Sequence, residues 1–322
     1  MIKIGIVGLG GMGTVHYHNY QYIDNCKVAA AVCNSENSKN KSKEFGIIPY
    51  ENIESMVKNE NIDVIDICLP TYLHKDYVME ALNFHKHVIV EKPIALHAKD
   101  AEEIFDLAEK NDLLLFVGQV VQFTKESEIL KDIVKNQTYG KPLDGYFKRL
   151  SASPKWTKEG WLFDKEKSGL LPFDLHVHDL DLIISLFGIP KSFNYTSCGR
   201  DEAGYKEAYR INYTFENLNV SAEAAWYNAD YPFSAAWRVY FERAVLEYDG
   251  KSLILYQNEK EPFEFDLKEE VVVPTGINLP PTGMFYNELS HFISCIENGI
   301  SSDRVSRNQI IKGIEIMEQI VN

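Results

Sequence analysis

The chain has 322 residues, more than one hydrophobic core usually accommodates, so we expect two domains. Hydrophobic residues make up 45% and charged residues 25%, and no apolar run approaches the length of a membrane span, so the composition is that of a globular protein that stays in solution. The formal net charge of −14 and the lack of any dense Lys/Arg run argue against nucleic acid as a partner.

Short apolar runs alternate with longer segments of helical pattern over about residues 1–120. This alternation predicts parallel strands joined by crossover helices, and the nearly continuous Val, Ile, Leu and Cys runs are typical of a sheet covered on both faces. The predicted strands are Lys3–Val7, Val28–Cys33, Val64–Leu69, His87–Val90 and Leu113–Val117. The predicted helices are Gly11–Asp24, Asn40–Phe45, Ile53–Lys58, His74–Asn83 and Ala98–Lys110.

A second unit is expected to begin near residue 120, where the pattern changes. Aromatic-rich, alternating segments between Phe193 and Val273 predict antiparallel strands of a large open sheet. The predicted strands include Leu143–Leu150, Arg210–Phe215, Val220–Trp226, Arg238–Phe241 and Leu253–Tyr256. The predicted helices are Glu126–Asn136, Pro172–Phe187, Phe285–Asn298 and Arg307–Ile320.

Together these elements predict an α/β protein of two domains. Residues 1–120 are expected to form a dinucleotide-binding Rossmann domain with a doubly wound parallel sheet. Residues 121–322 are expected to form an α/β domain with a large, mainly antiparallel open sheet, which would bind the substrate and support oligomerisation. The substrate is expected to bind between the two domains.

A glycine-rich turn directly follows the first predicted strand and opens the first predicted helix. It has the GxGxxG pattern, carried by Gly8, Gly10 and Gly13, with Gly11 and Met12 between them. Such a turn lets backbone N–H groups and the positive end of the helix approach a pyrophosphate. The strand and helix context therefore predicts a dinucleotide site here.

The end of the second strand normally supplies the acidic residue that binds the adenosine ribose, but this chain has Asn34 there, followed by Ser35. Asn34 can hydrogen-bond a ribose hydroxyl without repelling a 2′-phosphate, and no Arg stands next to it to attract one. The sequence therefore leaves NAD and NADP both open and slightly favours NAD.

Glu91-Lys92-Pro93 follows the fourth predicted strand and resembles the Glu-Lys-Pro signature of the Gfo/Idh/MocA family of oxidoreductases. The run from Leu69 to His74 resembles the family's loop beside the cofactor, and the run from Ser168 to Asp181 resembles its Asp-x-x-x-His helix. The resemblance covers essentially the whole chain. Besides the residues of the glycine turn, Asn34 and Ser35, the cofactor-binding residues that it implies are Pro70, Thr71, His74, Glu91, Lys92, Pro93 and Gln119.

Asp174 and His178 are four residues apart, which on a helix puts them on one face. With Pro172 at the helix start, Asp174 would lie in the first turn, where a carboxylate is favoured and could orient His178. Oxidation of an alcohol needs a base for the hydroxyl proton and a cation near the oxygen. The resemblance implies that His178 is this base, Asp174 its partner, and Lys92 the group that contacts the substrate oxygen and the nicotinamide.

Substrate contacts are expected from Gln122 and from Trp161, since aromatic faces suit the C–H surfaces of polyols. Trp156 and Phe163 could line the same pocket, although ordinary core packing explains all three aromatic side chains equally well. His176 points away from the Asp174 face by helical spacing. The cluster of His176, His178 and Asp181 invites a metal interpretation, but no fourth ligand presents itself, and we expect no metal.

These observations predict an NAD(P)-dependent dehydrogenase that acts on a CH–OH group of a sugar, cyclitol or similar small molecule. Two alternatives stay open: a redox-neutral glycoside-processing or epimerising enzyme that uses NAD transiently, and a non-catalytic, cofactor-binding regulator on the same fold. The absence of a secretory signal and the five scattered cysteines predict a cytoplasmic protein. By analogy, a homodimer or homotetramer is expected, with neither nucleic acid nor membrane as a partner.

Overall fold

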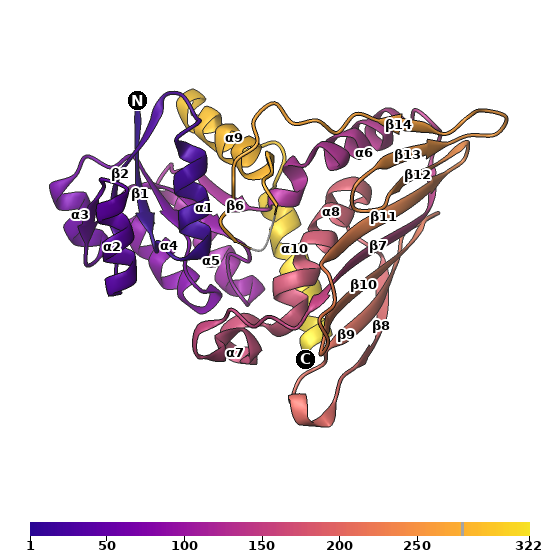
Figure 1. Cartoon of the computed structure of the whole chain (residues 1–322), viewed down its shortest axis with the longest axis horizontal. Helices are drawn as coiled ribbons and strands as arrows, with labels where there is room; N and C mark the ends of the chain where they lie inside the picture. Colours follow the sequence, from indigo (N-terminus) through magenta and orange to yellow (C-terminus); the bar gives the residue numbers. More distant parts are fainter. Residues whose placement is uncertain (278–279) are drawn as a thin grey trace. The chain divides into compact units, whose positions relative to one another are not determined.

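The computed structural model describes residues 1–277 and 280–322, which form two compact units (Figure 1). Unit 1 comprises Met1–Phe123 and Glu269–Ile311, and unit 2 comprises Thr124–Lys268 and Lys312–Asn322. The sequence predicts a single boundary near residue 120. The structure changes units close to that point, but the chain returns to unit 1 with Glu269–Ile311.

The sheet of unit 1 has six parallel strands in the order β3-β2-β1-β4-β5-β6. The strand order reverses between β1 and β4, which is the switch point of a doubly wound sheet, and ligands of such sheets bind beyond the carboxyl ends of the strands there. This topology confirms the predicted Rossmann sheet. The strands are β1 (Ile2–Val7), β2 (Cys26–Val32), β3 (Ile48–Tyr50), β4 (Val64–Ile67), β5 (His87–Glu91) and β6 (Leu115–Gly118).

Helices lie on both faces of this sheet, as the alternation of side chains along β1 shows. Ile4 and Ile6 point into the core shared with the last helix of the unit, α9. Gly5 points the other way, where an added Cβ would lie 2.6 Å from Cε of Met56. The helices and short 3₁₀ turns of the unit are α1 (Gly11–Tyr20), α2 (Glu36–Glu44), α3 (Ile53–Asn59), η1 (Thr71–Leu73), α4 (His74–Asn83), α5 (Ala98–Lys110), η2 (Val120–Phe123) and α9 (Met284–Asn298).

The apolar face of α9 explains why the chain returns to unit 1. Leu289, Phe292 and Ile293 are buried in the same cluster as the core residues of β1. The ring of Phe292 stacks on Phe116 of β6, with centroids 4.9 Å apart, and meets Phe123 edge-on at 5.6 Å. Without α9, these apolar side chains of the Rossmann sheet would lack part of their cover.

The sheet of unit 2 has eight strands in the order β14-β13-β12-β11-β7-β10-β9-β8, and only β7 and β10 pair in parallel. The predicted large, mainly antiparallel sheet is therefore confirmed. The strands are β7 (Pro142–Ala152), β8 (Ser192–Cys198), β9 (Ala208–Thr214), β10 (Asn219–Tyr227), β11 (Ser234–Phe241), β12 (Ala244–Tyr248), β13 (Leu253–Tyr256) and β14 (Phe263–Phe265).

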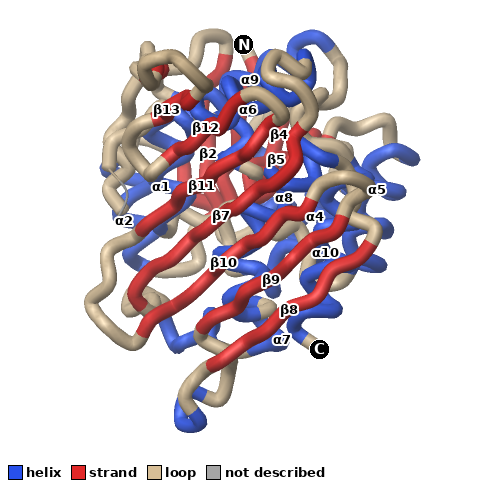
Figure 2. The backbone as a smooth tube through the Cα atoms, turned by 90° about the vertical axis from the view of Figure 1, so that its right-hand side faces the viewer, coloured by secondary structure: helices blue, strands red, loops and turns tan. Residues whose placement is uncertain are grey.

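One face of this sheet is buried and the other is open. Along β9, Tyr209, Ile211 and Tyr213 are buried, whereas the residues between them are exposed. Figure 2 shows the open face turned to the viewer, with no described helix of the unit crossing it. The helical elements of the unit are α6 (Lys125–Asn136), η3 (Lys158–Phe163), α7 (Lys165–Ser168), η4 (Pro172–His176), α8 (Val177–Phe187), η5 (Asp201–Ala203) and the part of α10 (Arg307–Val321) from Lys312 onward.

Within residues 1–277 and 280–322, no helix combines the length and the apolar character required to cross a bilayer.

A buried ion pair joins α8 to β7 in unit 2. Arg149 Nη2 lies 2.8 Å from Asp179 Oδ1, and its Nε lies 3.3 Å from Oδ2, so the contact is bidentate. Asp179→Ala should destabilise the protein by about 3–5 kcal/mol in urea unfolding, because Arg149 would keep a buried, uncompensated charge. The double variant Arg149→Met/Asp179→Leu should lose clearly less free energy of unfolding than Asp179→Ala. A single variant no less stable than the double would contradict this explanation.

Candidate active site

The three glycines of the fingerprint have different roles in the structure. Gly8 has a φ of +93°, and a Cβ on Gly13 would lie 1.9 Å from the carbonyl oxygen of Gly8, so no side chain fits there. At Gly10, in contrast, an added Cβ would meet no atom of the described residues within 4 Å. Gly8 and Gly13 therefore shape the turn, while Gly10 leaves space beside the first turn of α1, as a bound pyrophosphate requires.

The amino end of α1 has no side-chain cap, because Gly10 occupies the capping position. Thr14 Oγ1 donates a hydrogen bond to the carbonyl oxygen of Gly10 at 2.6 Å, and Lys41 Nζ donates one to Thr14 Oγ1 at 2.9 Å. Lys41 thus brings a positive charge close to the glycine turn. No sequence motif marks this lysine, because its place in α2 gives no sign of the contact.

Asn34 and Ser35 follow the carboxyl end of β2. Asn34 is exposed, and Ser35 caps α2, its Oγ accepting a hydrogen bond from the N–H of Ser38 at 3.2 Å. Both residues are exposed, but the hydroxyl of Ser35 serves the cap, so the Asn34 amide is the better candidate for a ribose contact. The expected ribose contacts of both residues stay predictions.

Two loops that resemble the cofactor-binding segments of the family are joined by His74. Its ring is buried, with Nδ1 2.7 Å from the carbonyl oxygen of Pro93 and Nε2 2.7 Å from that of Leu69. Burial lowers the pKa of His74, and the two carbonyls oppose this shift. The ring ties the loop after β4, which contains Pro70 and Thr71, to the segment after β5.

Glu91 and Lys92 stand at the carboxyl end of β5. Glu91 is buried, Lys92 is partly exposed, and one carboxylate oxygen of Glu91 accepts a hydrogen bond from the backbone N–H of Lys92 at 3.2 Å. The other carboxylate oxygen of Glu91 contacts His16 of α1. The polar environment of the Glu-Lys-Pro segment is thus built from α1 as well as from β5.

Gln119 and Gln122 follow β6, at the edge of the sheet where the other strands also end. Both side chains are buried. The Oε1 atom of Gln119 has no hydrogen-bond partner among the described residues, and buried acceptors in this state call for a ligand or water. Gln119 therefore fits the predicted cofactor role, and the substrate role of Gln122 stays a prediction.

In unit 2, Asp174 and His178 stand out from a buried segment. Every residue from Ser168 to Ile184 is buried except these two, which are partly exposed. A segment that is otherwise inside the protein thus exposes one carboxylate and one imidazole, four residues apart. Buried neighbours on both sides fix where each side chain emerges, which suits groups that must meet a substrate.

The sequence predicts that Asp174 and His178 lie on one regular helix, but the structure shows that the segment is not regular. Residues Pro172–His176 form a π-helical turn, η4, and α8 begins only at Val177. The wider turn changes the expected position of Asp174 in the first turn of an α-helix, although residues four apart still lie on similar faces. Single π-helical turns occur often at functional sites.

His176 belongs to the core of unit 2. Its Nε2 lies 2.6 Å from the hydroxyl of Tyr213, and its ring stacks on the Tyr213 ring. Burial, with a smaller contribution from the charge of Arg149, lowers the pKa of His176 to about 3. A buried and neutral imidazole cannot reach a substrate, so His178 is the better candidate of the two for the predicted base.

The three aromatic residues proposed to line a pocket lie in different surroundings. Phe163 stacks on Tyr205, with centroids 5.3 Å apart, and meets Trp226 edge-on at 5.8 Å, which is ordinary packing. Trp156 is 59% exposed, and Trp161 is partly exposed. Lys92 belongs to unit 1, whereas Asp174, His178 and the three aromatic residues belong to unit 2.

Comparison with protein families gives two matches. Residues 2–119 match the oxidoreductase family with an NAD-binding Rossmann fold, GFO_IDH_MocA. Residues 128–247 match the GFO/IDH/MocA C-terminal domain. The two matches together take in the glycine turn, the Glu-Lys-Pro segment and the Asp174–His178 segment.

Characterised relatives match the chain over part of their length. Over 193 residues it is 29% identical to 2,7-anhydro-N-acetylneuraminate hydratase of Escherichia coli, covering 60% of this chain and 51% of the relative. Over 189 residues it is 29% identical to myo-inositol 2-dehydrogenase of Thermotoga maritima, covering 58% and 55%. The matches thus span about half the length of these relatives.

Among solved structures, levoglucosan dehydrogenase in complex with NADH and levoglucosan superposes with a TM-score of 0.86. The alignment covers 99% of this chain and 96% of the other at 17% sequence identity. At this identity the similarity establishes the fold.

Proposed function

Because the chain belongs to the Gfo/Idh/MocA family of oxidoreductases, we propose that it transfers a hydride between a secondary alcohol of a sugar, cyclitol or similar small molecule and NAD. The observation that carries the proposal is the exposure of Asp174 and His178 from an otherwise buried segment. A protein that only bound a cofactor would gain nothing from presenting a base and a carboxylate in this way.

Each proposed catalytic residue has one task. His178 accepts the hydroxyl proton of the alcohol, while Asp174 orients the imidazole and favours its protonated form. Lys92 places its positive charge near the oxygen, where negative charge develops as the hydride leaves the carbon. A bound nicotinamide would supply the hydride acceptor, so the reaction would balance as one hydride to the cofactor and one proton to His178.

The residues of unit 1 fit a nicotinamide dinucleotide. The space that the described residues leave beside Gly10 and the uncapped end of α1 suit the pyrophosphate. The buried Oε1 of Gln119, which has no partner among those residues, is an acceptor for a ligand. The residues that would hold the cofactor are Gly8, Gly10, Gly11, Met12, Gly13, Asn34, Ser35, Pro70, Thr71, His74, Glu91, Lys92, Pro93 and Gln119.

A panel of sugars and inositols, including myo-inositol, tests the proposal when each compound is incubated with the protein and either NAD or NADP. Absorbance of the reduced nicotinamide should rise with at least one alcohol. Lys92→Met is the matched control, because it removes the charge but keeps most of the side-chain volume, and it should abolish the signal. A signal that Lys92→Met leaves unchanged would contradict the assignment of Lys92.

One comparison favours a second candidate function. The Escherichia coli relative is named as a hydratase, which indicates that this family includes reactions other than net alcohol oxidation. A redox-neutral reaction would convert a sugar without accumulating reduced nicotinamide. Mass spectrometry of the panel after incubation separates the two candidates, because only the redox-neutral enzyme would give product without an absorbance change.

The choice between NAD and NADP is expected to depend on Asn34. Asn34→Asp should raise the preference for NAD over NADP, because a carboxylate at this exposed position repels a 2′-phosphate. The measurement is the ratio of the two dissociation constants, obtained from quenching of protein fluorescence by NADH and NADPH. Equal changes in the dissociation constants for NADH and NADPH would show that Asn34 does not face the ribose.

For the assembly, we propose a homodimer or homotetramer, supported by the face of the eight-stranded sheet that no described helix of unit 2 covers.

A further inference from the structure

Two acidic side chains are buried in the sheet of unit 1. Asp66, in the middle of β4, is 0% exposed, and Glu91, the last residue of β5, is 9% exposed. Buried carboxylates are costly unless they are paired and hydrogen-bonded, so the structure must compensate both charges. The proposed reaction uses neither of them directly.

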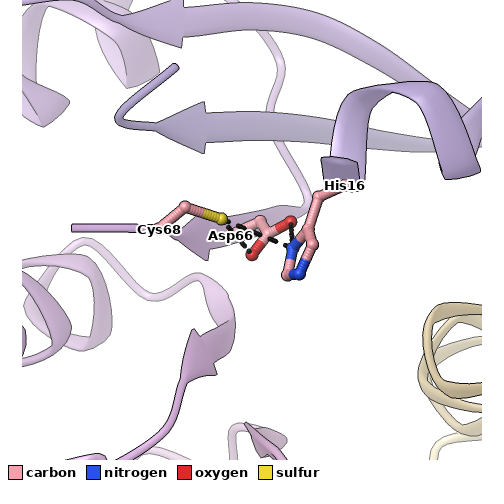
Figure 3. A group of neighbouring side chains, drawn as sticks. All are labelled: His16, Asp66 and Cys68. Atoms are coloured by element: carbon pink, nitrogen blue, oxygen red, sulfur yellow. Dashed lines mark hydrogen bonds and ion pairs between the residues drawn. The ribbon is translucent and has the colours of Figure 1, made fainter. Parts of the chain in front are cut away.

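The sheet register puts the two carboxylates on one face. Asp66 pairs with Ile89 across the β4–β5 ladder, and Glu91 stands two residues further along β5, so its side chain points to the same side. Helix α1 covers that side and inserts His16, which is also 0% exposed, between them. Figure 3 shows the ring of His16 directed at Asp66, with Cys68 beside them.

Both ring nitrogens of His16 face carboxylate oxygens. Nδ1 lies 2.8 Å from Asp66 Oδ2, and Nε2 lies 3.1 Å from Glu91 Oε1. A neutral imidazole has one N–H, so one of these contacts would set a nitrogen lone pair against a carboxylate. Two N–H groups satisfy both contacts, which makes His16 a cation between two anions.

The other groups packed against His16 support this charge state. Burial alone would lower the pKa of His16, but the nearby charge of Asp66 and the hydrogen bond to it raise the pKa well above its ordinary value. Burial raises the pKa of the Tyr20 hydroxyl and of the Cys68 thiol, so both stay neutral. Tyr20 donates a hydrogen bond to Asp66 Oδ2 at 2.9 Å, and the ring of Phe285 also packs against His16.

His16, Asp66 and Cys68 also have ligand atoms close enough together to suggest a metal ion. The distances favour hydrogen bonds. Two ligands on one tetrahedral zinc ion, each at about 2.0–2.1 Å, are roughly 3.4 Å apart. His16 Nδ1 and Asp66 Oδ2 are 2.8 Å apart, and Glu91 occupies the other ring nitrogen.

The cluster ends at the proposed catalytic lysine. Glu91 accepts from His16 with one carboxylate oxygen and from the backbone N–H of Lys92 with the other. The chain of contacts therefore runs from Asp66 through His16 and Glu91 to the backbone from which the Lys92 side chain starts. A change at His16 reaches Lys92 through a single carboxylate.

We propose that His16 is a positioning residue that, as a buried imidazolium held between Asp66 and Glu91, fixes the backbone of Lys92 for the reaction. This inference rests on the proposed role of Lys92. It adds that the charge of His16 matters, and that a neutral side chain of similar size cannot replace it.

The charge state is tested first in the wild-type protein, without substrate. NMR of protein containing 15N-labelled histidine gives the protonation of each ring as the pH is raised, and the His16 signal is identified by its loss in His16→Gln. His16 should keep both protons at pH values above the ordinary histidine pKa of about 6.5. Deprotonation near that ordinary value would overturn the proposal, as would coordination shifts of His16 on addition of zinc chloride.

The link to Lys92 is tested by trace acetylation with acetic anhydride, followed by mass spectrometry of the lysine peptides. The rate at Lys92 is divided by the rate at Lys58, which lies on the surface of α3. His16→Gln should change this ratio of acetylation rates at least twofold at every pH of the NMR titration. His87→Gln is the matched control, since His87 lies at the opposite end of the same strand, and it should leave the ratio unchanged.

Kinetics separate the inference from the proposed function. On an alcohol that supports turnover, His16→Gln should lower kcat roughly 10- to 100-fold, the scale expected from a small misplacement of a catalytic group, with the KM for NAD changed less than about twofold. If Lys92→Met is inactive but His16→Gln keeps wild-type kcat and labelling, the positioning role is wrong. If Lys92→Met is itself fully active, the proposed role of Lys92 is wrong, whereas the absence of turnover by the wild type on every alcohol would contradict the proposed function.

Discussion

His178→Ala should slow turnover at least about 100-fold, the low end of what a positioned acid or base contributes, while NADH affinity changes little. The reason is that His178 is the one imidazole exposed from the buried segment Ser168–Ile184, and alanine cannot accept the hydroxyl proton. The measurement is kcat on an alcohol from the sugar and inositol panel, together with a fluorescence titration with NADH.

The matched control is His18→Ala, which removes a partly exposed histidine from α1 of unit 1 and should leave kcat unchanged. Asp174→Asn should give a smaller loss than His178→Ala, because it weakens the orientation of the base without removing it. Near-wild-type activity of His178→Ala would show that the base is wrongly assigned. His176 could not take its place, being buried and neutral, so a tyrosine of unit 2 would be the next candidate.

Gly10→Asp should abolish dinucleotide binding while leaving the protein folded. An added Cβ at Gly10 meets none of residues 1–277 and 280–322 within 4 Å, so we expect the fold to tolerate a side chain there. The carboxylate would fill the space expected for the pyrophosphate and repel it. Fluorescence titration with NADH measures the loss, and circular dichroism checks the fold.

Two alanine variants make this test specific. Gly10→Ala should stay folded and keep measurable affinity, because a methyl group carries no charge. Gly13→Ala should instead disturb the fold, because its Cβ would lie 1.9 Å from the carbonyl oxygen of Gly8. A folded Gly10→Asp variant with unchanged affinity would mean that the phosphates bind elsewhere.

Local sequence patterns predicted much of the Rossmann unit. The predicted helices His74–Asn83 and Ala98–Lys110 have the same bounds in the structure, because both show clear apolar periodicity and follow strand ends. Strand β3 was missed, since it has only three residues, Ile48–Tyr50, with a proline in the middle. Such a short edge strand owes its existence to pairing with β2 rather than to its own pattern.

The sequence predicted those candidate-site residues that lie in motifs. It missed the buried residues near them that belong to no motif. Gly10, Lys92 and His178 lie in recognisable motifs. Asp66 lies in a strand that is otherwise apolar, and an acid at such a position requires a buried partner. That single charge was the available signal, but the sequence could not show that α1 brings His16 to it, because the contact spans 50 residues.

The π-helical turn before α8 also lay beyond sequence reasoning. Pro172 and the stop at Gly188 predict a helix, and a helix is present, but the widened turn at Pro172–His176 depends on how the segment packs. The sequence likewise does not tell which sheet receives the apolar face of α9. That pairing became visible only from the contacts of Phe292 with Phe116 and Phe123.

The return of Glu269–Ile311 to unit 1 has a consequence for synthesis on the ribosome. Although the Rossmann strands are translated first, their core stays incomplete until α9 has left the exit tunnel, after all the strands of unit 2. A nascent chain halted before that point exposes Phe116 and Phe123, which makes it a substrate for chaperones and prone to aggregate. The N-terminal unit is thus among the last parts of the chain that can finish folding.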